Sequence, residues 1–136
     1  MDFELDGVIP HIIDLIARID ADAVVRRHLN QIDYTIHGYW HGEEYFEEVT
    51  IGPSIHVRLV DAAVGVNASP EYGGWIRLRF ALEAADVSQA GPTLSIASEG
   101  RVADLALIFD ANSQFIDEQW TINRDSPLVG GMERKV

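Results

Sequence analysis

The chain has 136 residues, of which 47% are hydrophobic and 24% charged, and it contains no cysteine. These values indicate one globular domain that buries a core without disulfides, and they exclude thiolate catalysis and cysteine-ligated zinc. Ten basic against twenty-two acidic residues give a formal net charge of -12, which disfavours nucleic acid as a partner.

Residues 9–29 are predicted to form two consecutive helices. No basic region with a long apolar run precedes them, so we expect no signal peptide, no membrane partner and a cytoplasmic location. Apolar residues recur every three or four positions in the first helix, and Pro10 suits its first turn. The pattern then restarts, with Asp20 or Asp22 as the candidate N-cap and Asn30 as the end.

After Asn30 the hydrophobic period changes to two, which predicts strands. Residues 32–37 alternate between apolar and polar side chains, as in a half-buried strand. The segment "GEEYFEEV" (42–49) is expected to be a short helix, because its apolar residues fall on one side. Further strands are expected at 55–59, 76–82 and 94–97, with loops at "NASPEYGG" (67–74) and "SQAGPT" (88–93).

The clearest hairpin spans residues 101–123. Alternating apolar residues from Ala103 to Phe109 form one face, "DANS" forms the turn, and Ile116, Trp120 and Ile122 form the face of the return strand. The tail at 127–136 contains Pro127 and two glycines. We therefore expect one domain at 1–126 and a flexible or partly docked tail.

Glu118 interrupts the apolar face of the return strand, with Ile116 and Trp120 at the same parity. Burial there would raise its pKa and suit it to general acid or base catalysis, unless an arginine pairs with it. The candidate arginines, all on predicted strands, are Arg58, Arg77 and Arg79. The alternatives are a structural ion pair or exposure at a sheet edge.

His37 and His41 are four residues apart, and Glu43 or Glu44 could complete a divalent metal site with them. Two glycines interrupt this segment, and spacing supplies no fourth ligand. We therefore predict no metal and no cofactor. Several aromatic residues could line an apolar ligand pocket or simply fill the core. The proposed ligand-binding residues are Tyr39, Trp40, Trp75, Phe80 and Trp120.

The order of helices and strands predicts an α+β fold, with N-terminal helices packed on a mostly antiparallel, strongly curved sheet. Three stretches, "LIARIDADAVVRRHL", "YTIHGYWHGEEYFEEV" and "ADLALIFDANSQFIDEQWTIN", resemble the nuclear transport factor 2-like superfamily, which includes ketosteroid isomerases and polyketide cyclases. The resemblance implies a cone-shaped sheet and pairing of two copies through their convex faces. It also implies that Tyr34 and His37 point toward a pocket mouth.

Two functions from different classes follow from these observations. The first is a small-molecule-binding domain or a cofactor-independent enzyme that transfers protons, as in isomerisation, dehydration or cyclisation. Its catalytic residues would be Glu118 as acid or base, with His37 and Tyr34 orienting the substrate. The alternative is an acidic, non-catalytic module that binds a basic protein, such as an immunity or inhibitor protein that covers a toxin.

Overall fold

The structure is a computed structural model that describes residues 7–66, 73–85 and 100–132. Within these residues the chain forms two helices and seven strands, which confirms the predicted α+β class. The helices are α1 (Val8–Ala17) and α2 (Ala21–Gln31). The strands are β1 (Thr35–His41), β2 (Glu44–Ile51), β3 (Ile55–Val66), β4 (Gly74–Ala84), β5 (Arg101–Asp110), β6 (Phe115–Ile122) and β7 (Val129–Gly130).

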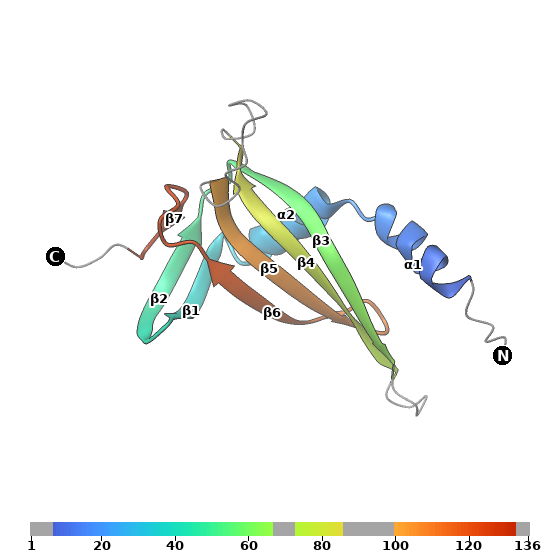
Figure 1. The fold of residues 1–136 in the computed structure, drawn as a ribbon. Helices are drawn as coiled ribbons and strands as arrows, with labels where there is room; N and C mark the ends of the chain where they lie inside the picture. Colours follow the sequence, from blue (N-terminus) through green and yellow to red (C-terminus); the bar gives the residue numbers. More distant parts are fainter. Residues whose placement is uncertain (1–6, 67–72, 86–99, 133–136) are drawn as a thin grey trace.

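The described strands divide into two antiparallel sheets. One has the order β1-β2-β7 and the other the order β3-β4-β5-β6. In Figure 1, α2 lies against the four-stranded sheet, whereas α1 extends away from both sheets. We call the face of this sheet that carries Leu78, Phe80 and Leu105 its inner face, and the opposite face its outer face.

The core lies between α2, the inner face and the three-stranded sheet. Its fully buried side chains include Leu29 from α2, Val49 from β2 and Phe80 from β4. Helix α2 begins at a defined cap, because the Asp20 side chain accepts a hydrogen bond from the Ala23 N–H at 3.1 Å. This cap fixes where α2 begins, and its buried side carries Val25, His28 and Leu29.

The segment predicted as a short helix at 42–49 is the strand β2, so that prediction was wrong. Gly42 has a φ of +61° and allows a tight turn from β1 into β2. The two strands then pair from His41–Glu44 to Thr35–Thr50. Tyr45 and Phe46 have an intrinsic preference for strands, and the hairpin pairing with β1 makes this segment a strand.

The predicted strand at 32–37 starts later, at Thr35. Asp33 and Tyr34 have φ values of +57° and +53°, so the chain turns sharply between α2 and β1. The Tyr34 N–H donates to the Leu29 carbonyl at 2.8 Å and closes this turn. The alternation at 32–37 therefore combines a turn with the first residues of β1.

The predicted hairpin at 101–123 is confirmed as β5 and β6. Asp110 organises its turn, because its Oδ1 accepts the N–H groups of Asn112 and Gln114 at 2.8 and 3.0 Å. The position of Ile116 was predicted wrongly. The register shifts between Ile108 and Phe109, so Phe115 pairs with Phe109, and Ile116 is exposed.

Parts of several predicted segments lie outside the described residues. These parts are the strand at 94–97, the loop at 88–93 and most of the loop at 67–74. In the tail, Val129 and Gly130 form β7 on the edge of β2, and Met132 is buried in the core.

Candidate functional site

A histidine and a glutamate far apart in the sequence meet on the inner face. His28 lies on the buried side of α2 beside Leu29, and Glu118 lies on β6 opposite Leu107. The His28 Nε2 and the Glu118 Oε2 are in direct hydrogen-bond contact. The His28 side chain is 8% exposed and the Glu118 side chain 28%, so the pair is largely shielded from water.

The pKa of the Glu118 carboxyl lies below its ordinary value of 4.5, mainly because the His28 ring donates a hydrogen bond to the carboxylate. Burial alone would raise the pKa, and this opposing effect is outweighed. Trp120 also lowers the pKa, although its buried Nε1–H makes no hydrogen bond of ordinary geometry. Glu118 is therefore an ionised acceptor and not the neutral acid that burial beside apolar residues suggested.

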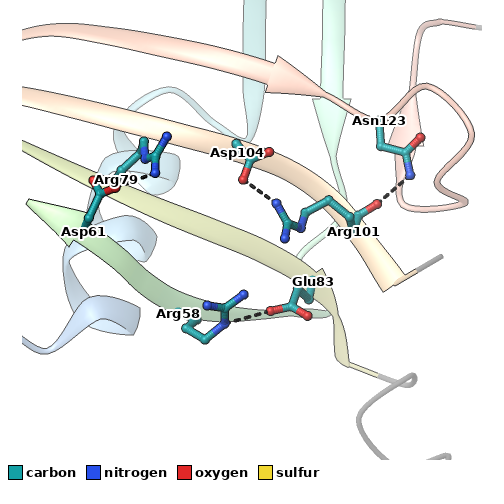
Figure 2. A network of polar contacts seen from close by, with 7 residues as sticks. All are labelled: Arg58, Asp61, Arg79, Glu83, Arg101, Asp104 and Asn123. Carbon is teal, nitrogen blue, oxygen red and sulfur yellow. Dashed lines mark hydrogen bonds and ion pairs between the residues drawn. The ribbon is translucent and has the colours of Figure 1, made fainter. Parts of the chain in front are cut away.

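The arginines considered as partners of Glu118 lie on the outer face, as Figure 2 shows for Arg58 and Arg79. Arg79 pairs with Asp61 there, and the Arg58 Nε contacts Glu83 at 3.3 Å. Because side chains alternate between the two faces of a strand, neither arginine reaches Glu118. The carboxylate on the inner face is held by an imidazole instead.

The rest of the outer face follows the same pairing of opposite charges. Arg101 contacts Asp104 at 2.5 Å, and its carbonyl accepts a hydrogen bond from the Asn123 amide at 2.7 Å (Figure 2). These ion pairs distribute both signs of charge over the outer face of the four-stranded sheet. That face is therefore a mixed-charge surface.

A cleft of about 320 Å³ opens beside His28, between α2 and the β5–β6 hairpin. Its apolar lining residues are Val24, Leu107, Phe109 and Phe115, and its polar ones are Arg27, His28, Gln31 and Ser113. The Phe115 ring lies 5.0 Å from the His28 ring, measured between centroids, and 6.3 Å from the Phe109 ring. The cleft thus combines an aromatic wall with a few polar groups, the usual character of a small-molecule site.

Three predicted site residues lie on the inner face. Glu118 contacts His28 beside the cleft, and Trp120 follows it on the same side of β6. Phe80 is fully buried in the core opposite Leu59 and has no surface open to a ligand. Tyr39 supports the site indirectly, since its hydroxyl accepts the Ile122 N–H at 2.9 Å at the end of β6.

The other predicted site residues lie elsewhere. Tyr34 lies beside Arg26 in the turn before β1, and His37 is exposed next to Glu48. Trp40 is exposed, and its ring contacts that of Tyr45 in a tilted arrangement with centroids 5.0 Å apart. Trp75 lines a second, open hollow of about 410 Å³ where β3 ends and β4 begins.

His28, Arg27 and Phe115 are the residues that sequence reasoning missed at this site. His28 carries a local signal, because it lies four residues after Val24 and three after Val25, on a helix side that is otherwise apolar. A titratable residue at such a position has to find a buried partner. Phe115 had no such signal, because its inward orientation depends on the register shift in the hairpin.

The described residues contain no group of three or more histidine, cysteine, aspartate or glutamate side chains that could hold a metal ion. None of their helices is both long and apolar enough to cross a membrane. No protein-family model, curated protein or solved structure matches this chain.

Proposed function

We propose that this chain is a small-molecule-binding domain whose site is the cleft beside His28. The observation that carries the proposal is the buried pair of His28 and Glu118 at the wall of a cleft lined by phenylalanines. A shielded imidazole that is oriented by a carboxylate costs conformational freedom and desolvation, and it contributes little to an apolar core. Such a pair is typical of sites where a proton or a polar ligand is handled.

The pair supports cofactor-independent proton transfer. Because the Glu118 carboxylate accepts the proton on Nε2, the neutral imidazole has its lone pair on Nδ1. Nδ1 makes no hydrogen bond to any described residue and is free to accept a proton from a ligand. The resulting imidazolium is stabilised by Glu118 and can return the proton to another atom of the ligand. His28 is therefore the residue that accepts and returns the proton, and Glu118 is a positioning residue that orients the His28 ring.

The lining defines the class of ligand. The aromatic wall suits a small aromatic or aliphatic body, while Arg27, Gln31 and Ser113 can bind a carbonyl or carboxylate oxygen at the rim. Arg27 makes no ion pair within the described residues, so its charge is available to an anionic group. The resemblance to the nuclear transport factor 2-like superfamily, with its cone-shaped sheet, is part of the same proposal.

Calorimetric titration with phenylacetate and with its neutral analogue phenylacetamide tests the binding site. We expect phenylacetate to bind, and Phe115→Ala to weaken binding by about tenfold through lost apolar contact. Arg27→Gln should weaken the binding of phenylacetate and leave the affinity for phenylacetamide nearly unchanged. His37→Gln is the matched control and should bind like the wild type. Equal affinities in all variants would place binding elsewhere and overturn the site.

Proton transfer is tested by following the exchange of the α-hydrogens of phenylacetone for deuterium in D2O by NMR. We expect the protein to accelerate this exchange and His28→Gln to abolish the acceleration, whereas His37→Gln should keep it. Acceleration that survives His28→Gln would refute the role of His28. Binding without any acceleration would restrict the function to binding.

A further inference from the structure

Helix α1 is apolar on nearly every side and lies uncovered. Its sequence is "VIPHIIDLIA", in which only His11 and Asp14 are polar. Ile9 is 63% exposed and Ile13 61%, and α1 makes no extensive contact with another element of the described chain. A helix of this composition is ordinarily buried, so α1 requires a covering surface.

The turn between α1 and α2 holds α1 away from its own sheet. The N–H groups of Arg18 and Ile19 donate to the carbonyls of Leu15 and Ile16 at 3.2 and 3.0 Å. Asp20 caps α2, and Ile19 packs against the core. Ile19 and Asp20 thus anchor the chain directly after α1, and α1 leaves this anchor pointing away from both sheets, which favours a second chain as the partner.

The same chain carries a matching surface, which we call the end row. Val64, Ile76, Phe109 and Phe115 are paired in register across the inner face at one end of the four-stranded sheet. Val64 is 50% exposed and Phe115 49%, and the cleft beside His28 and the hollow near Trp75 flank this row. A helix placed across the end row would cover its exposed apolar side chains.

The apolar side chains of α1 are sufficient for a stable interface. Three isoleucine or leucine side chains of α1 are exposed, namely Ile9, Ile13 and Leu15. Burial of each removes roughly 100 Å² of apolar surface, so two helices remove roughly 600 Å². Counting the surfaces that they cover, this area reaches the lower end of the ~1,200–2,000 Å² of specific protein interfaces. The polar residues His11, Asp14 and Arg18 form a narrow stripe that remains in water, and Arg18 contacts Asp14 at 2.8 Å.

We propose that the chain forms a symmetric dimer in which α1 of each copy packs across the end row of the other. Each copy supplies both the helix and its acceptor, so the contact is reciprocal and closes with two copies. The net charge of -12 and the scarcity of basic residues on α1 disfavour an anionic membrane surface as the occupant. Phe109 and Phe115 belong to both the end row and the cleft beside His28, so in this dimer α1 of the partner copy also borders the ligand cleft.

Light scattering during size-exclusion chromatography tests the dimer. We expect the full chain to have twice its 15.1 kDa mass. Ile13→Asp should weaken dimerisation at least about 100-fold, because it buries an unpaired charge. His11→Asp adds the same charge on the polar stripe and should leave the dimer intact. Both variants should keep the wild-type circular dichroism spectrum. A monomeric wild type, or equal effects of the two variants, would overturn the proposal.

Cross-linking identifies the occupant of the end row. The chain has no native cysteine. In a mixture of the single variants Ile13→Cys and Val64→Cys the two positions can be joined only between chains, each single variant alone controls for disulfides between identical positions, and the double variant reports a cross-link within one chain. We expect covalent dimers on a non-reducing gel. A cross-link within one chain would show that α1 covers its own sheet and would overturn the proposed packing of α1 on the other copy. Cosedimentation of the wild type, but not of Ile13→Asp, with phosphatidylcholine vesicles would show that a membrane covers α1, which also overturns it.

Discussion

Two histidine–glutamate contacts in this chain show how burial gives the same side chains different roles. His37 and Glu48 are 3.8 Å apart and both more than two-thirds exposed, so water screens their interaction. His28 and Glu118 are in direct contact and largely shielded. Only the second contact orients an imidazole beside a cleft, which makes it the functional candidate.

The lowered pKa of Glu118 makes a prediction about stability and pH. Because its folded-state pKa lies below 4.5, the ionised carboxylate stabilises the fold above that pH, and this contribution is lost as the pH falls through the folded-state pKa. Glu118→Gln should lower the free energy of unfolding by about 1 kcal/mol near neutral pH, and the deficit should shrink in acid. Urea unfolding across the acidic range measures this difference.

Glu48→Gln is the matched control, because it removes the same charge from the exposed pair. Its free energy of unfolding should follow that of the wild type at every pH. A deficit in Glu118→Gln that does not change with pH would contradict the ionisation assigned to Glu118.

Sequence reasoning located Glu118 but not its partner. The parity of β6 places Glu118 among apolar residues, and this is a local property of eight residues. The partner is 90 positions away on α2 and was sought among arginines of neighbouring strands. Because alternation directs those arginines to the outer face, only the packing of α2 across the sheet could identify His28.

At the scale of elements, hairpins determine the structure more than intrinsic propensities do. The helix pair and the β5–β6 hairpin were predictable, since their hydrophobic periods and turn residues agree. Residues 42–49 were not, because their apolar spacing fits a helix side as well as a strand. The left-handed turn at Gly42 and the pairing with β1 decide in favour of the strand.

The turn at Gly42 can be tested directly. A Cβ atom at this position meets nothing within 4 Å, so the cost of a side chain comes from the φ of +61° alone. Gly42→Ala should destabilise the fold by about 1 kcal/mol, and Gly42→Asn by less, because asparagine tolerates this conformation. Thermal unfolding measures the relative stabilities of the wild type, Gly42→Asn and Gly42→Ala. Equal stability of Gly42→Ala and the wild type would mean that the turn relaxes into another shape.

Tyr39 connects the two sheets. Its hydroxyl accepts the N–H of the buried Ile122, which lies on the edge strand β6. Tyr39→Phe leaves this N–H without a partner and should lower the free energy of unfolding by about 1–2 kcal/mol. Tyr45→Phe removes the hydroxyl of an exposed tyrosine and should have a smaller effect in the same urea titration. Equal effects would show that Tyr39 does not connect the sheets.

For the whole molecule, the packing of α2 on the four-stranded sheet creates the site. The outer face of that sheet pairs its acids with arginines, so the net charge of -12 is not concentrated there. The cleft itself contains Arg27, which makes no ion pair in the part of the chain that the structure describes. An anion with an apolar body is therefore attracted to Arg27 in the cleft.

Binding of a small apolar ligand against His28 in this cleft can be observed at the histidine itself. The most direct measurement is NMR of the histidine ring nitrogens during titration with phenylacetate. We expect the His28 signals to shift and to saturate with the affinity found by calorimetry, while those of His37 stay constant. Saturable binding with unchanged His28 signals, or no binding of phenylacetate or phenylacetamide, would contradict binding against His28.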